Sequence, residues 1–196
     1  MERKWVIAAF LDLTGFRSWT YRAATAPEVK ERFIGEFYRV LQSHVKTNLH
    51  SWSKYEGDGM LTIREFTPAQ KKDVQGYILS LKTLLRNVKR VVIESDGPRG
   101  GARIRIMDGY VYKLTVLDPN DPERKRMIPE YLEYCTNTVR GFLEVNPEIP
   151  CLATEGVVKA LGKPRSIFRV RPLGKPSTYP KGVNSEDTDG LQILRF

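Results

Sequence analysis

The chain has 196 residues, of which 41% are hydrophobic, 10% aromatic and 28% charged. This length and composition suit one globular domain spanning residues 1–196, and they exclude wholesale disorder and a disulfide-stapled miniprotein. The net charge of +9 suits a polyanionic partner such as a phosphorylated small molecule, a nucleic acid or an acidic membrane surface. The charges are scattered, however, which is typical of a solvated surface, and we expect no nucleic-acid partner.

The chain shows no sign of a membrane span or an export signal. No apolar run approaches the roughly 20 residues that a transmembrane helix needs. The apolar run at 5–11 is followed at once by Asp12 and by no small-residue cleavage site, so it predicts a buried strand rather than a signal peptide. Cys135 and Cys151 provide neither a disulfide framework nor zinc-ligand spacing. We therefore expect a cytoplasmic protein.

The first part of the chain predicts an α+β domain with a ferredoxin-like core. Helical spacing of apolar residues after Pro27, turn residues around Asp58 and a Gly-rich break at 97–101 separate the elements. In chain order the pattern predicts a strand at 5–11, a helix over about 29–45, a hairpin over 51–66, a helix opening at Thr67 and a strand at 102–114. The order βαββαβ is that of ferredoxin-like domains.

The remainder of the chain predicts αβ additions to this core. The pattern predicts a helix from about Pro129 to Val145, a short strand at 151–153, a helix over 155–161 and strands near 167–171 and 191–195.

Two carboxylates follow the first two predicted strands. Asp12 comes directly after the first strand, and Asp58 lies in the turn that ends the second. A right-handed crossover makes these strands parallel, so their carboxyl ends share one edge of the sheet and the two side chains should be neighbours. A pair of carboxylates suits a divalent cation that also binds phosphates. The alternative is an Asp-Gly hairpin turn and a helix-capping Asp, without metal.

The residues around these carboxylates resemble the motifs of class III nucleotidyl cyclases. The similar segments, in chain order, are Asp12-Leu13-Thr14-Gly15-Phe16, Lys54-Tyr55-Glu56-Gly57-Asp58-Gly59, Arg103-Ile104-Arg105-Ile106 with Gly109, Glu130 to Gly141, and Lys181-Gly182-Val183. The family pattern has Gly at the position of Arg105 and Arg at the position of Gly141. The resemblance covers nearly the whole chain in the family's order.

The resemblance implies a role for each matched residue at the phosphates. Asp12 and Asp58 would bind two Mn²⁺ or Mg²⁺ ions, and the N–H groups of Leu13, Thr14, Gly15 and Phe16 would cradle the β- and γ-phosphates. Gly141 has no side chain to supply the family's transition-state charge, so the resemblance leaves Arg140, Lys181 and Arg103 as possible sources.

The same resemblance implies the contacts to base and ribose. Lys54 and Glu130 occupy the positions that read the base, and Asn137 the position that orients the ribose. Asp12 and Asp58 would come from one subunit and Asn137 from the other, which implies a homodimer with sites at the interface.

The expected activity is the conversion of a nucleoside triphosphate to its 3′,5′-cyclic monophosphate and pyrophosphate. The bulk of Tyr55 near Lys54 predicts a small base, although strand alternation would place the two side chains on opposite faces. UTP as first choice and CTP as second follow mainly from a family resemblance. A standalone cyclase domain also resembles the pyrimidine cyclases of antiphage signalling, which make cyclic UMP or cyclic CMP as second messengers. The alternatives are an adenylate cyclase, a catalytically inactive cyclase-like binding domain, and an RNA-binding module of the same core.

Overall fold

The structure is a computed structural model. It describes residues 2–195 except 49–50, 68–69, 119, 121–122, 124, 126, 133–140, 142–144, 146–147, 163–168 and 174–190. The strands are β1 (Glu2–Leu13), β2 (Ser51–Glu56), β3 (Gly59–Glu65), β4 (Ala102–Leu117), β5 (Met127–Leu132), β6 (Cys151–Ala153), β7 (Arg169–Pro172) and β8 (Gln192–Arg195). The helices are α1 (Phe16–Thr20), α2 (Pro27–Thr47), α3 (Lys71–Glu94) and α5 (Glu155–Leu161).

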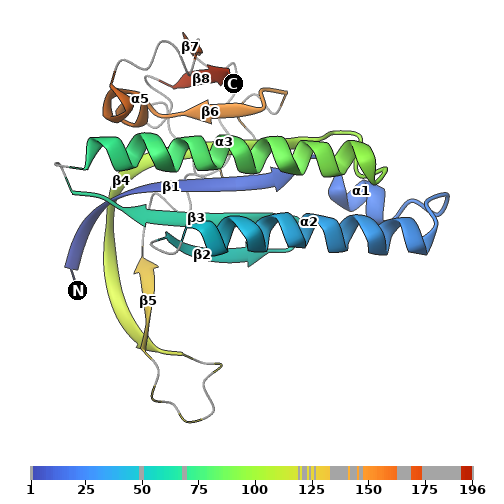
Figure 1. Cartoon of the computed structure of the whole chain (residues 1–196), viewed down its shortest axis with the longest axis horizontal. Coiled ribbons are helices and arrows are strands. Elements are labelled where there is room, and N and C mark those ends of the chain that lie inside the picture. The colour runs from blue at the N-terminus through green and yellow to red at the C-terminus, as the bar shows by residue number, and fades with distance from the viewer. Residues whose placement is uncertain are drawn as a thin grey trace.

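One eight-stranded sheet organises the domain. Seven strands follow the order β2-β3-β1-β4-β6-β8-β7, and β5 pairs with β4 off this path. The central strands β1, β3 and β4 are antiparallel neighbours, and α2 and α3 lie across one face of the sheet (Figure 1). This arrangement confirms the predicted α+β class and its ferredoxin-like core.

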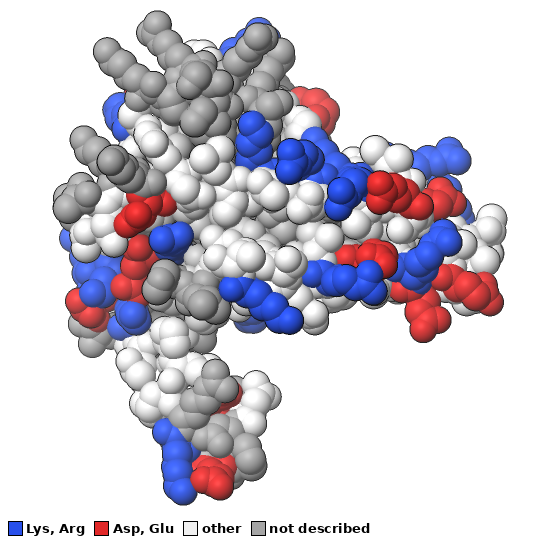
Figure 2. All heavy atoms as spheres, viewed as in Figure 1, with Lys and Arg blue, Asp and Glu red and all other residues white. Residues whose placement is uncertain are grey.

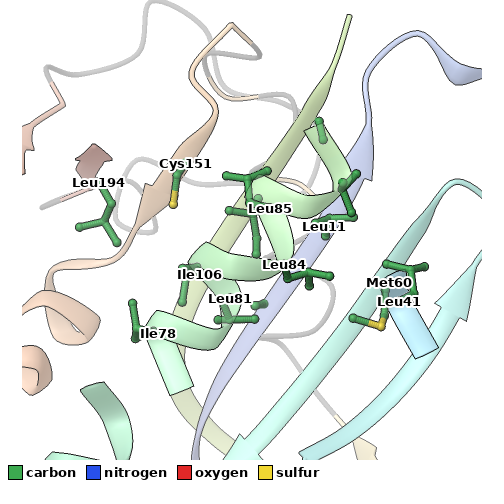
Figure 3. Packing of buried hydrophobic residues seen from close by; sticks show 14 of the residues in the cluster. Leu11, Leu41, Met60, Ile78, Leu81, Leu84, Leu85, Ile106, Cys151 and Leu194 are labelled. Atoms are coloured by element: carbon green, nitrogen blue, oxygen red, sulfur yellow. The ribbon is translucent and has the colours of Figure 1, made fainter. Parts of the chain in front are cut away.

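The continuous apolar run of β1 explains its position in the centre of the sheet. Its residues from Val6 to Leu13 are buried on both faces of the sheet. The odd-numbered side chains, such as Leu11, contact the helices, and Figure 3 shows Leu81, Leu84 and Leu85 of α3 over this face. The even-numbered side chains, such as Phe10, belong to a second cluster on the opposite face. A continuous apolar run is what a strand buried on both sides requires.

Two predicted helix starts are wrong. Residues Met127–Leu132 form a strand antiparallel to β4, where the sequence predicts a helix from Pro129. The reason is non-local, because β4 continues to Leu117 and its added length provides backbone partners for β5. The second predicted helix, α3, begins at Lys71 rather than Thr67. The Thr67 N–H donates to Gln70 Oε1 at 2.7 Å, which is the contact that a Gln makes in a capping box.

β3 does not offer a platform for stacking nucleic-acid bases. Met60, Leu61 and Ile63 are each at most 2% exposed. Figure 2 shows Lys and Arg alternating with Asp and Glu over the two helices instead of forming one basic patch. Both observations speak against the RNA-binding alternative.

His44 on α2 is a buried neutral histidine with a consequence for acid stability. Its side chain is 7% exposed, and its Nε2 atom has no hydrogen-bond partner among the described residues. Burial lowers the pKa of His44 from 6.5 to about 4. Protonation therefore favours the unfolded chain, whose histidine accepts a proton at higher pH than the folded one.

We predict that this histidine makes the free energy of unfolding fall as the pH is lowered from about 6.5 to about 4, by up to about 3 kcal/mol. Chemical denaturation at several pH values measures the loss. A His44→Leu variant, compared at each pH, should lack this part of the loss because no proton can bind there. Parallel curves for the two proteins would contradict the prediction.

Candidate active site

Asp12 and Asp58 meet at one edge of the sheet. Asp12 is the register partner of Gly59 across the β1–β3 ladder, and the Leu13 N–H donates to the Asp58 carbonyl oxygen at 3.1 Å. The juxtaposition predicted from the strand order is confirmed. The two carboxyl-bearing residues lie 46 positions apart in the sequence, so only the paired strands bring them together.

The turn that carries Asp58 is held in a defined place. Gly57 has φ +60°, a conformation that favours glycine. A Cβ on Gly59 would stand 2.4 Å from the Leu11 carbonyl oxygen, so this position also requires glycine. The Tyr38 hydroxyl of α2 donates to the Gly57 carbonyl oxygen at 2.8 Å. Backbone and helix therefore fix the turn beside the end of β1.

Asp12 is bonded to an arginine from β4. The Arg103 Nε donates to Asp12 Oδ2 at 3.0 Å, and Arg103 Nη2 lies 3.0 Å from the same oxygen. Both residues are 9% exposed and are register partners across the β1–β4 ladder. A buried carboxylate needs such a partner to remain charged. The pair orients one oxygen of Asp12 and places a cation at the same edge of the sheet.

Lys54 and Tyr55 lie on opposite faces of β2. Lys54 shares a register line with Leu61 and Phe10, on the face of Asp12, and its Nζ lies 4.0 Å from Glu56 Oε1. Tyr55 packs on the other face, with its ring centroid 5.8 Å from that of Tyr38. The prediction that Tyr55 crowds the base position next to Lys54 is wrong, because adjacent strand residues alternate and no bulge intervenes.

The loop after β1 uses two of the four amides expected to cradle phosphates. The Leu13 N–H is bonded to Asp58 as described, and the Thr14 N–H donates to the Gly101 carbonyl oxygen at 2.9 Å. Gly15 takes φ +77° and starts α1, a helix the sequence does not predict. Of the four N–H groups predicted to bind the phosphates, those of Gly15 and Phe16 therefore remain as candidates. The Phe16 ring packs on Trp19, as a core aromatic would.

Glu130 is far from Lys54 within one chain. It is the register partner of Leu114, whereas Lys54 lies on the register line of Arg105, nine residues away on β4. This separation is about 30 Å along the strand. Figure 1 shows β4 and β5 projecting from the body of the sheet as an arm. The predicted site residues Asn137, Arg140 and Lys181 lie outside the described residues.

Arg105 stands where the resembled cyclase motif has Gly. In the structure it is a buried cation with a structural role. Its side chain is fully buried. Its Nη1 donates to the carbonyl oxygens of Ile149 at 2.9 Å and Ile104 at 3.1 Å, and its Nη2 donates to that of Val145 at 3.2 Å. Burial lowers the pKa of Arg105 to about 10, so the side chain still carries its charge at neutral pH. Arg105 thus ties Val145 and Ile149 to β4, two positions from Arg103.

The carboxylate ligands at the sheet edge fit a divalent cation that is also coordinated by a substrate. Asp12 and Asp58 offer carboxylate oxygens, the ligands preferred by Mg²⁺. Among the residues that the structure describes, no group of three or more His, Cys, Asp and Glu gathers at one point. Mg²⁺ commonly binds one or two carboxylates and completes its shell with waters and substrate phosphates. The donor set therefore fits a metal that arrives with a nucleotide.

Solved structures of nucleotide cyclases align with this structure over most of its length. The guanylyl cyclase Cya2 aligns with a TM-score of 0.66 and 17% identity, over 98% of this chain and 91% of that one. The adenylyl cyclase CyaB from P. aeruginosa aligns with a TM-score of 0.68 and 14% identity, over 100% and 95%. The chain has the fold of nucleotidyl cyclases. A class III adenylyl cyclase-like ATP-binding protein from Pseudomonas aeruginosa also aligns, with a TM-score of 0.59 and 16% identity, over 82% of this chain and 35% of that one.

At the level of sequence, no protein-family model and no curated protein matches this chain. Identities of 14–17% with the solved structures accompany a shared fold. In the described part of the chain, no helix combines the length and apolar character needed to cross a bilayer.

Proposed function

We propose that the chain is a metal-dependent nucleotidyl cyclase. It would convert a nucleoside triphosphate to the 3′,5′-cyclic monophosphate and pyrophosphate, as the ribose 3′-oxygen bonds to the α-phosphorus and the bond to the β-phosphoryl oxygen breaks. The observation that carries the proposal is the pairing of Asp12 and Asp58 at one sheet edge within a cyclase fold. The proposed setting is the cytoplasm, without a membrane span.

The chain's own residues would bind and position the substrate. Asp12 and Asp58 would hold two Mn²⁺ or Mg²⁺ ions, which supply charge neutralisation and acidify the ribose hydroxyl. Arg103 keeps Asp12 charged and oriented, and it adds positive charge beside the phosphates. The amides of Gly15 and Phe16 would face the phosphates, and Lys54 would reach the base from the face that carries Asp12. Catalysis here rests on positioning and electrostatics.

The proposed base is a pyrimidine, with UTP first and CTP second. With Tyr55 on the opposite face from Lys54, this choice rests on the resemblance to the pyrimidine cyclases of antiphage defence, where the product serves as a second messenger. Lys54 keeps ATP as the alternative substrate. Equal concentrations of the four triphosphates, incubated with the protein and Mn²⁺ or Mg²⁺, test both levels of the proposal. Dominant cyclic AMP would overturn the pyrimidine choice, and no cyclic product would overturn the cyclase.

A homodimer would complete the site. Lys54 and Glu130 can meet only if Glu130 comes from a second copy, because they lie about 30 Å apart along β4 in one chain. The arm that carries Glu130 also exposes apolar side chains, with Leu117 52% and Met127 52% exposed. Such side chains on a projecting hairpin suit a protein interface. Two-fold symmetry would then give two equivalent sites.

Mixing two inactive variants tests this dimer. Asp58→Ala removes a metal ligand from one half of each site, and Asn137→Ala removes the ribose contact from the other half. Heterodimers should regain up to about half of the wild-type activity per dimer, because one of the two symmetric sites is then intact. Activity is measured as cyclic nucleotide formed after mixing and re-equilibration. No recovery, with a sedimentation mass of a monomer, would contradict the dimer.

An inactive binding domain is the second candidate function. Gly141 stands where the family pattern has its transition-state Arg, and one structural neighbour is described as an ATP-binding protein. This candidate predicts metal-dependent triphosphate binding by calorimetry without any cyclic product. The first candidate predicts both.

A further inference from the structure

A pocket of about 540 Å³ lies next to the proposed catalytic edge. It is formed by the last turns of α3, the loop at 97–101 and the segment before β6. Thr14 and Arg103 also line it, and Arg103 is the partner of Asp12. In Figure 1 the end of β1 and helix α1 lie beside this end of α3. The pocket thus shares Thr14 and Arg103 with the sheet edge that carries Asp12.

The charges around the pocket are unbalanced. Lys89, Arg99 and Arg103 line it, and Glu148 is the single carboxylate among its described lining residues. Arg103 is bonded to Asp12, whereas no described contact pairs Lys89 or Arg99 with a carboxylate. Two cations therefore face the pocket without an acidic partner in the described part of the chain.

Lys89 is the more informative of the two. Its side chain is partly buried, and burial lowers the pKa of its ammonium. The ionisable group next to it is the Cys151 thiol, whose pKa burial raises to about 12. That thiol is uncharged at neutral pH and cannot balance Lys89. A partly buried charge without a counter-ion is costly, and an anion in the pocket would offset the cost.

The wall that joins the pocket to Asp12 is firmly held. The Thr14 N–H donates to the Gly101 carbonyl oxygen at 2.9 Å, and the Gly101 N–H donates to that of Pro98 at 3.0 Å. A Cβ on Gly100 would stand 2.4 Å from the Thr14 carbonyl oxygen, so the two loops are in close backbone contact. The cations are thus presented on a fixed frame, as a binding site requires.

We propose that this pocket is a second anion site that binds phosphate oxyanions, with pyrophosphate as its occupant. The assignment of pyrophosphate rests on the proposed function, whose reaction releases that anion beside Arg103. The site differs from the proposed metal centre in its described lining, which has three cations and does not include Asp12 or Asp58. Two or three cations around one small anion match the charge of pyrophosphate better than that of orthophosphate.

Calorimetric titration of the full chain with pyrophosphate in EDTA tests the site. Without metal, the carboxylates of Asp12 and Asp58 repel pyrophosphate. Binding measured in EDTA therefore indicates binding in the pocket. We expect Lys89→Met and Arg99→Gln each to weaken pyrophosphate binding about tenfold, the loss of one charge-assisted contact. Lys89→Arg should retain binding. Arg86→Gln, an exposed change on the same helix, is the matched control.

The outcomes separate this proposal from the proposed function. Binding that is unchanged in the Lys89→Met/Arg99→Gln double variant, or equally weakened by Arg86→Gln, would overturn the site. Equal affinity for orthophosphate and pyrophosphate would support a phosphate site and overturn pyrophosphate as its occupant. Because the titration involves no turnover, it also stands if the protein makes no cyclic nucleotide. As an independent readout, the pKa of Lys89 followed by NMR should rise when pyrophosphate is added, and an unchanged pKa would count against the site.

Discussion

Replacing Asp58 with Asn should lower cyclic nucleotide formation at least about a thousandfold, a loss of about 4 kcal/mol of transition-state stabilisation. Asp58 lies in a turn that backbone bonds and Tyr38 hold in place, so the fold should persist without its charge. The measurement is the initial rate at saturating Mn²⁺ or Mg²⁺. Asp73→Asn, which removes an exposed carboxylate from the start of α3, is the control and should keep normal activity.

Asp12 should behave differently from Asp58 in stability. Asp12→Asn should also abolish activity, because the charge rather than the shape binds the metal. Asp12→Ala should in addition destabilise the fold, since it leaves the 9% exposed guanidinium of Arg103 without its carboxylate partner. Thermal unfolding of both variants separates the two effects. Near-normal turnover by any of the three Asp12 or Asp58 variants would refute the two-metal assignment.

Replacing Arg105 with Met should lower the free energy of unfolding by about 3 kcal/mol or more, because three carbonyl oxygens lose a charged donor in the protein interior. Three carbonyl oxygens, from Ile104, Val145 and Ile149, accept from its guanidinium. Chemical denaturation measures the change. Arg86→Met, on the exposed surface of α3, should change stability by less than about 0.5 kcal/mol.

The conservative change at Arg105 gives a second comparison. Arg105→Lys keeps the charge but cannot reach three carbonyl oxygens from one planar group, so an intermediate loss is expected. If the Arg105→Met protein proved as stable as the wild type, the guanidinium would not be what holds Val145 and Ile149 to β4.

Local patterns determined much of this protein. The apolar run of β1, the helical spacing of α2 and the glycine turn at 57–59 each encode an element through neighbouring residues, and the structure confirms them. The strand order that follows from them also placed Asp12 beside Asp58, because the carboxyl ends of the first two strands share an edge. The family motifs added the expected chemistry.

Tertiary structure decided what depends on distant partners. Residues Met127–Leu132 became a strand because β4 extends far enough to pair with them, which a local helical pattern cannot reveal. Strand alternation put Tyr55 on the face opposite Lys54, but its ring partner, Tyr38 of α2, came only with the packing of that helix. The bond of Arg103 to Asp12, and the pocket that Arg103 shares with Lys89, depend on the packing of β4 and α3 against the end of β1. Spacing along a chain encodes which face a residue takes, whereas the partner it meets depends on which elements pack together.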